Sequence, residues 1–182
     1  SRVLDYEPAD LTATVEAGIT LDQLQHQLST GEQILPLESP LAEKSTIGGV
    51  LAANTTGPMR YAYGQPRDWL IGIAVVGAKG KETKAGGKGV KNVTGYDLNK
   101  LYTGSLGTLG VIVEATFKLA PYPTGRGTLV AGFQTLGRGI DAGSALFQQV
   151  CAPQGVQVVD RQVAGQLNTG PGAAFLSQLG TN

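Results

Sequence analysis

The sequence predicts an α+β protein with a mainly antiparallel sheet and flanking helices. Three observations carry this prediction: several segments are rich in β-branched and apolar residues, two of them meet at a glycine turn, and two others have helical patterns. Because 41% of the 182 residues are hydrophobic, the chain can build one domain, or two small ones, around a real core.

The first predicted strand covers residues 11–17, and a helix over residues 20–30 follows it. Thr20 is a suitable N-cap, and Gly31 stands where a left-handed residue would end the helix. His26 lies off the apolar stripe of this helix, so we expect it to face solvent. The stripe consists of Leu21, Leu24 and Leu28.

A second, smaller helix is predicted over residues 46–53. Residues 34–40 before it should be extended, because two prolines disfavour helix in the residues that precede them. Ser45 or Thr46 can cap the helix, and its first turn carries a glycine pair that allows close approach of another backbone or a ligand. Residues 57–66 are predicted to form a loop.

Strands over residues 69–77 and 81–85 form a predicted hairpin. A short helix over 97–102, a glycine repeat over 104–110 and a strand over 111–119 complete a first domain, residues 1–122. A second domain, residues 123–182, follows the boundary near Pro121. For it we expect strands at 128–133 and 156–159, a helix at 140–150 and a frayed tail from residue 167.

Charge and rare residues exclude several functions. Fourteen basic residues balance fourteen acidic ones, so no nucleic-acid partner is expected. Cys151 is the only cysteine and His26 the only histidine, which excludes a disulfide and makes metal or Ser-His chemistry unexpected. The longest apolar run is too short to span a membrane and no signal peptide is recognisable, so we expect a cytoplasmic protein.

The glycine clusters suggest phosphate binding, but two standard motifs fail. Gly80-Lys81 lacks the Ser or Thr and the upstream glycine of a Walker A loop, and the 104–110 repeat precedes a strand instead of opening a Rossmann helix. What remains is a series of clusters whose main-chain N–H groups and bare Cα atoms suit a long, flat, phosphate-bearing ligand. For any single glycine, a turn remains the simpler explanation.

Four segments together resemble the FAD-binding fold of the vanillyl-alcohol oxidase and p-cresol methylhydroxylase (PCMH) class: 40–57, 63–67, 91–98 and 104–112. Residues 91–98 (Lys-Asn-Val-Thr-Gly-Tyr-Asp-Leu) most resemble the FAD-binding subunits of glycolate oxidases. The resemblance implies that residues 1–122 are the second subdomain of a PCMH-type FAD-binding domain and that 123–182 begin an α+β cap domain. It also implies an upstream subdomain with the pyrophosphate loop, which we expect to be missing here.

The resemblance also assigns site residues. The stretch from Thr46 would lie along the pyrophosphate and ribityl chain, Asn54 and Gly57 would lie near the flavin, and the stretch from Gly107 would approach the cofactor by main chain. The residues that match cofactor-binding positions are Pro40, Thr46, Ile47, Gly48, Gly49, Asn54, Gly57, Gly64, Gly107, Thr108, Gly110, Val111 and Ile112. Since His26 and Cys151 lie outside these motifs, FAD should be non-covalent, and this chain alone should not hold it tightly.

The implied activity is oxidation of a small 2-hydroxy acid such as glycolate by hydride transfer to the flavin. Arg60, Tyr61, Tyr63 and Arg67 could face the substrate carboxylate or pair with loop carbonyls or Asp68. Implied partners are other glycolate oxidase subunits, including an iron–sulfur subunit, through which the protein could attach peripherally to a membrane. Two alternatives stay open: a non-catalytic flavin-fold subunit that serves assembly, and a reductase of cell-wall precursors.

Overall fold

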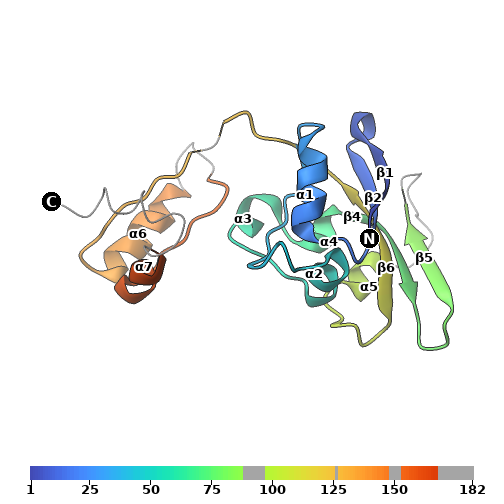
Figure 1. Ribbon diagram of the computed structural model, residues 1–182. Coiled ribbons are helices and arrows are strands. Elements are labelled where there is room, and N and C mark those ends of the chain that lie inside the picture. Colours follow the sequence, from blue (N-terminus) through green and yellow to red (C-terminus); the bar gives the residue numbers. More distant parts are fainter. Residues whose placement is uncertain (88–96, 126, 148–152, 168–182) are drawn as a thin grey trace. The chain divides into compact units, whose positions relative to one another are not determined.

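The computed structural model describes residues 1–87, 97–125, 127–147 and 153–167, which divide into two units, Ser1–Tyr122 and Pro123–Asn182. Unit 1 contains a five-stranded sheet in the order β1-β2-β6-β4-β5, and every neighbouring pair is antiparallel (Figure 1). The predicted antiparallel sheet is therefore confirmed. Its strands are β1 (Val3–Glu7), β2 (Thr12–Glu16), β4 (Leu70–Val76), β5 (Glu82–Gly86) and β6 (Val111–Lys118).

Helices α1 (Leu21–Ser29) and α2 (Ile47–Ala53) lie on the same side of this sheet (Figure 1). The leucine stripe of α1 is buried as predicted, and His26 is exposed. A small second sheet, β3 (Gln33–Ile34) with β7 (Ala120–Pro121), lies outside the main one. The core between helices and sheet includes Ala13, Val15, Leu21, Leu24, Leu28, Ile47, Val50, Leu51, Ile73, Val75, Ala115 and Phe117.

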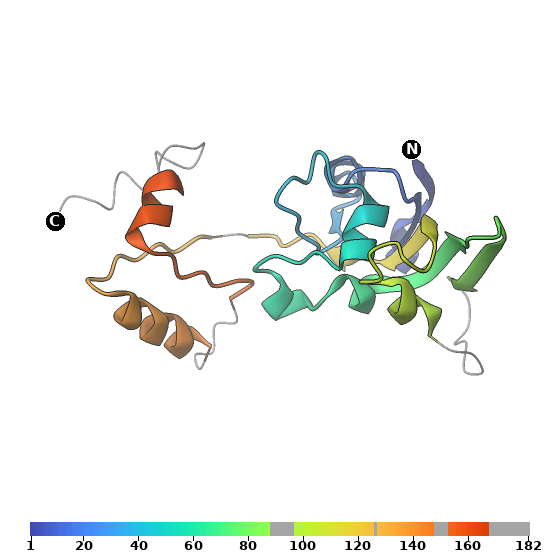
Figure 2. The same ribbon diagram turned by 90° about the horizontal axis from the view of Figure 1, so that it is seen from below.

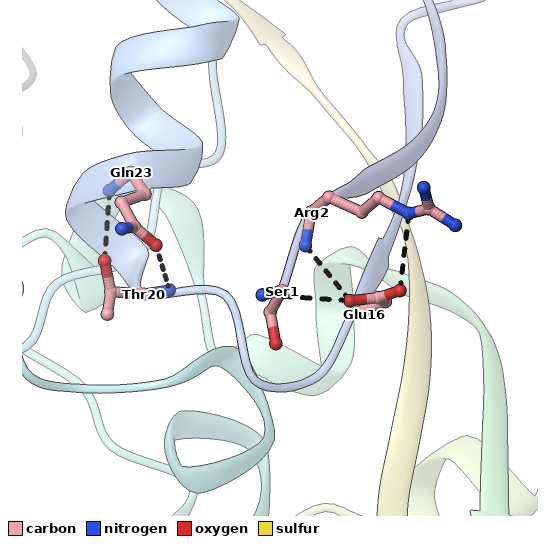
Figure 3. Close-up of polar contacts among 5 residues, drawn as sticks. All are labelled: Ser1, Arg2, Glu16, Thr20 and Gln23. Carbon is pink, nitrogen blue, oxygen red and sulfur yellow. Dashed lines mark hydrogen bonds and ion pairs between the residues drawn. The ribbon is translucent and has the colours of Figure 1, made fainter.

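Side-chain caps fix where α1 begins (Figure 3). Thr20 Oγ1 accepts the N–H of Gln23 at 3.2 Å, and Gln23 Oε1 accepts the N–H of Thr20 at 3.3 Å. Nearby, Glu16 Oε1 lies 3.5 Å from Arg2 Nε, which links the ends of β1 and β2. The prediction that Gly31 adopts the left-handed conformation is wrong. Glu32 has the positive φ, 54°, because the turn after α1 extends through Gly31 to Glu32.

The opposite face of the sheet is polar. Thr14 Oγ1 and Thr116 Oγ1 share a hydrogen bond of 3.0 Å across β2 and β6. Lys84 Nζ lies 3.6 Å from Glu114 Oε2, and Lys118 Nζ lies 5.1 Å from the Trp69 ring centroid. This face therefore needs no apolar cover, and the apolar core lies on the side of the sheet where α1 and α2 pack.

Short helices connect these elements. Residues 57–66, predicted as a loop, contain α3 (Arg60–Tyr63) and the start of α4 (Pro66–Trp69). A 3-10 turn covers Pro8–Asp10, and the predicted helix at 97–102 is α5 (Leu98–Tyr102). Strand β4 begins after α4 because Leu70 has extended backbone angles.

Unit 2 differs from its prediction. It contains α6 (Leu136–Leu146) and α7 (Arg161–Leu167), so the helix expected at 140–150 begins four residues earlier. The strands expected at 128–133 and 156–159 are wrong: both segments lack strand structure, because neither has a neighbouring strand to pair with among the described residues. In the part of the chain that the structure describes, no helix is long and apolar enough to cross a membrane.

Candidate cofactor-binding site

Two predicted glycine segments lie against each other. The loop from Gly104 to Gly110 runs beside α2, since the N–H of Gly104 donates to Leu51 O at 2.9 Å and that of Leu106 to Ala52 O at 2.8 Å (Figure 2). At the other end of α2, the carbonyl of Ile112 approaches Gly48. We call this surface, residues 49–54 with residues 104–111, the glycine wall.

Gly48 and Gly49 have different surroundings. A β-carbon on Gly48 would lie 3.0 Å from Ala17 Cβ and 3.2 Å from Ala17 O, so its absence lets α2 pack against the end of β2. A β-carbon on Gly49 would meet only Thr46 Oγ1, at 3.2 Å, and Gly49 is exposed. Gly49 therefore leaves bare surface that a ligand can approach.

The first N–H groups of α2 already have acceptors. Those of Ile47 and Gly48 donate to Ile19 O and Ala17 O at 2.9 and 2.7 Å. Those of Gly49 and Val50 donate to Thr46 Oγ1 and Thr46 O. The helix start is consequently anchored to the protein, and it offers a phosphate fewer donors than its sequence suggests.

Unused main-chain donors lie elsewhere on the same side. In the described part of the chain, the N–H groups of Gly107, Leu109 and Gly110 have no intramolecular acceptor, and neither do those of Thr56 and Gly57. Gly107 and Gly110 have φ values of 74° and 157°, which aim successive peptide groups in directions a regular element would not allow. Leu109 and Thr56 escaped the sequence analysis because they are not glycines, although both are close neighbours of predicted glycines.

Three large apolar side chains of the 104–111 segment are exposed. Leu106, Val111 and Leu109 are 74, 66 and 48% exposed. Leu106 also has a φ of 53°, a left-handed conformation that costs a non-glycine residue about 1 kcal/mol. Exposed apolar side chains this close together in the chain are typical of a surface that a ligand or partner covers.

Two buried polar atoms on the wall lack partners. Asn54 ends α2 in the left-handed conformation, and its Nδ2 donates to Gln65 Oε1 at 2.9 Å. Its Oδ1 and the Oγ of Ser105 are buried without a hydrogen bond. A buried polar atom without a partner costs about 1–3 kcal/mol, so both atoms fit a site where a ligand supplies the missing bond.

Gly57 and Gly64 line a small, partly open hollow beyond Asn54. Its other lining residues are Pro36, Leu37, Glu38, Thr55, Thr56, Met59 and Arg60. Glu38 Oε2 accepts the N–H of Met59 at 2.7 Å, and a β-carbon on Gly57 would collide with the Glu38 side chain. Glu38 is therefore a residue of the site that the sequence analysis missed.

The remaining predicted residues are more dispersed. Pro40 lies in the exposed turn before α2, Thr108 folds its hydroxyl back onto Ser105 O at 2.7 Å, and Ile112 is buried in the core. Of the four candidate substrate-facing residues, only Arg60 lines the hollow. Tyr63 lies instead beside Trp69, whose Nε1 donates to Tyr63 O at 2.7 Å.

Some predictions lie outside the described residues, namely Lys91 to Tyr96 of the glycolate oxidase motif and Cys151. Asp97, which follows that motif, caps α5 by accepting the N–H of Lys100. A hydrogen bond from the Lys100 side chain, with Nζ 2.9 Å from Oδ2, lowers the pKa of Asp97. Within the described ranges, no three His, Cys, Asp or Glu side chains gather to hold a metal ion.

The residues present fit a dinucleotide with a flat ring. The wall combines exposed apolar surface, a bare Cα at Gly49 and free N–H donors, which are the features that rings and phosphates require. The two orphaned atoms, Asn54 Oδ1 and Ser105 Oγ, add polar partners of fixed position.

Comparison with known proteins agrees with this geometry. Residues 1–86 match the family model described as "FAD binding domain". The chain is 36% identical over 162 residues to glycolate oxidase subunit GlcD of Bacillus subtilis (88% of this chain, 34% of the relative). It is 38% identical over 122 residues to glycolate oxidase subunit GlcE of Escherichia coli (66% of this chain, 35% of the relative). The chain thus spans about a third of the length of these relatives.

Other relatives are a D-2-hydroxyglutarate dehydrogenase of Stutzerimonas stutzeri and a D-lactate dehydrogenase of Archaeoglobus fulgidus. Among solved structures, an alkyldihydroxyacetonephosphate synthase superposes with a TM-score of 0.58 at 29% identity, covering 68% of this chain and 22% of that one. Residues 1–86 are therefore similar to the FAD binding domain family, unit 1 has a fold like that of PCMH-type FAD-binding proteins, and this similarity indicates FAD as the cofactor.

Proposed function

We propose that this chain is part of a flavin-dependent oxidoreductase that acts on a small 2-hydroxy acid, with glycolate as the first candidate. The relatives support the reaction class, because they are described as glycolate oxidase subunits and as dehydrogenases of D-lactate and D-2-hydroxyglutarate. The observation in the structure that carries the proposal is the glycine wall, where Gly49 leaves bare surface beside free main-chain donors.

The residues of this chain would bind and orient the cofactor. The free N–H groups of Gly107, Leu109 and Gly110 suit anionic oxygens, and the exposed leucines beside them suit an aromatic ring. Asn54 Oδ1 would accept a hydrogen bond from a ring N–H. When bound, FAD supplies a ring that accepts a hydride from the α-carbon of the acid.

Reductive titration of the purified complete protein tests this proposal. We expect oxidised-flavin absorbance, and anaerobic glycolate, D-lactate or D-2-hydroxyglutarate should bleach it. Absence of flavin from the complete protein would contradict the assignment of the wall. Bound flavin that none of the three acids bleaches would contradict the proposed reaction while leaving the cofactor site intact.

The second candidate is a flavin-fold subunit that serves assembly and does not turn over substrate. One observation favours it: among the described residues that line the hollow, Glu38 is the only carboxylate and there is no histidine, so a general base is not evident. In either case we propose that the chain assembles with other glycolate oxidase subunits, including one with iron–sulfur clusters. Copurification from the native host, followed by iron analysis, tests this partnership.

A further inference from the structure

The hollow beyond the glycine wall combines positive charge with free main-chain donors. Arg60 is its only cationic lining residue, and the N–H groups of Thr56 and Gly57 lack acceptors in the described part of the chain. Thr55 and Thr56, whose side chains carry hydroxyl groups, also line the hollow. A guanidinium beside two main-chain N–H groups and two hydroxyls is the donor set that holds a carboxylate.

The Arg60 side chain makes no ion pair with the described residues. The main-chain N–H of Arg60 donates to Gly57 O, but no carboxylate among the described residues lies within ion-pair distance of its guanidinium. Glu38 shares the hollow without pairing to Arg60, since Glu38 Oε2 is held by the N–H of Met59 at 2.7 Å. The guanidinium is therefore available to a ligand, which a structural arginine in a closed ion pair would not be.

The position of the hollow relates it to the cofactor surface. Asn54 ends α2 on the wall. Its Nδ2 donates to Oε1 of Gln65, which follows the lining residue Gly64 in the chain. From Asn54 the chain runs directly into Thr55, Thr56 and Gly57, which line the hollow. A ligand in the hollow would thus lie at the end of the wall where Asn54 stands.

We propose that this hollow binds the carboxylate of the 2-hydroxy acid, with Arg60 as the charged partner and the Thr56 and Gly57 N–H groups as fixed donors. The inference rests on the proposed function for the presence of the acid, and it adds the subsite and the residue. The hollow is partly open and encloses room for about one water molecule, so only the carboxylate end of the acid would enter it.

Steady-state kinetics of the flavin-loaded complete protein provide the first test. We expect Arg60→Gln to raise KM for glycolate at least tenfold, equivalent to about 1.4 kcal/mol, with a change in kcat below about threefold. Arg60→Lys should recover part of the affinity, because it restores the charge without the planar fork. Arg2→Gln is the matched control: Arg2 is an exposed arginine before β1 and outside the hollow lining, and its variant should keep the parent KM.

An unchanged KM in Arg60→Gln, in enzyme that keeps its flavin absorbance and turnover, would overturn the carboxylate subsite but not the proposed function. Loss of flavin absorbance in that variant would also overturn it, since Arg60 would then serve the cofactor. Parent protein that lacks flavin would instead contradict the proposed function.

A second test does not depend on flavin. Oxalate, a dianion of similar size, is titrated into the isotopically labelled 182-residue chain and followed by NMR. We expect the Thr56 and Gly57 amide signals to shift with a millimolar dissociation constant in the parent chain and in Arg2→Gln, but not in Arg60→Gln. Absence of these shifts in the parent chain, or equal shifts in both variants, would overturn the subsite.

Discussion

Gly48 and Gly49 show how one sequence motif divides into two physical roles. Gly48 lacks a β-carbon because Ala17 occupies the space, so it serves packing between α2 and the end of β2. Gly49 is exposed, and a β-carbon at this position would meet only the capping residue Thr46. The sequence predicts the pair as a whole, but only the tertiary contacts separate the structural glycine from the one that a ligand can use.

This division predicts opposite outcomes for two neighbouring substitutions. Gly48→Ala should destabilise the fold by about 1–3 kcal/mol, because the new methyl group would lie 3.0 Å from Ala17 Cβ. Gly49→Val should leave the apo fold intact and raise the dissociation constant of FAD at least tenfold in the complete protein, about 1.4 kcal/mol. Urea unfolding measures the first effect and flavin titration the second.

Unchanged FAD affinity in Gly49→Val would contradict the role of the wall. If Gly48→Ala proved as stable as the parent chain, α2 would have more freedom to shift than its contacts indicate.

Among the elements, those with a strong local signal were predictable. Helix α1 has both a capping box and three leucines at helical spacing, so local and tertiary preferences agree. The strands of unit 1 were predictable for the same reason. Residues 128–133 and 156–159 have the same β-branched composition but no partner strand among the described residues, and composition alone does not make a strand.

The candidate site was predictable in part. The 104–110 segment lies against α2, and the role of both segments toward a cofactor stays a prediction. The free donors of Leu109 and Thr56, and Glu38 in the hollow, depend on which N–H groups remain unused after folding. The start of α2 shows the converse. The carbonyl groups of Ala17 and Ile19 accept main-chain N–H groups that the motif predicted to be available to a phosphate.

Helix α5 provides a pH-dependent test at this scale. The Lys100 side chain and main chain both donate to Asp97, which lowers its pKa below the ordinary 3.8. A depressed pKa contributes stability above pH 3.8, and this contribution disappears as the pH falls through the folded-state value. We expect Lys100→Met to move the pKa of Asp97 up towards 3.8, measured by carboxyl NMR titration.

Lys79→Met is the control for this titration, since Lys79 lies in the exposed β4–β5 turn far along the chain from α5. An equal change in both variants would mean that general charge, and not the Lys100 hydrogen bond, sets the pKa of Asp97.

At the scale of the whole molecule, the two units differ in how much they bury. Unit 1 holds every large apolar side chain of the buried core, from Val15 in β2 to Leu119 after β6. In the described residues of unit 2, only Gly139 and Gly143 are buried, and Leu129, Phe133 and Ile140 are at least half exposed. Hydrophobic burial, the main stabilising term, is therefore concentrated in unit 1.

We expect residues 1–122 to fold without unit 2. Thermal unfolding followed by circular dichroism should give a cooperative transition within about 3 °C of that of the 182-residue chain, because the core contributes the cooperativity. A transition that broadens, or falls by more than about 10 °C, would show that unit 2 stabilises unit 1 through contacts outside the described residues.

The glycine wall also predicts that the 182-residue chain holds FAD weakly. Its free donors and its apolar side chains all belong to one exposed surface, whereas tight cofactor sites bury about 70–90% of the ligand between converging walls. A ring held on one side leaves its second face and several phosphate oxygens in water, and binding still costs the full loss of translational freedom. We expect the purified chain to be colourless after gel filtration and to bind FAD no tighter than micromolar.

Quenching of the fluorescence of Trp69, the only tryptophan, measures this affinity, since Trp69 Nε1 donates to Tyr63 O, next to the hollow residue Gly64. A yellow chain with one FAD per molecule would show that the described wall is closed by other residues of these 182, and the same titration on residues 1–122 would then show whether unit 2 supplies them.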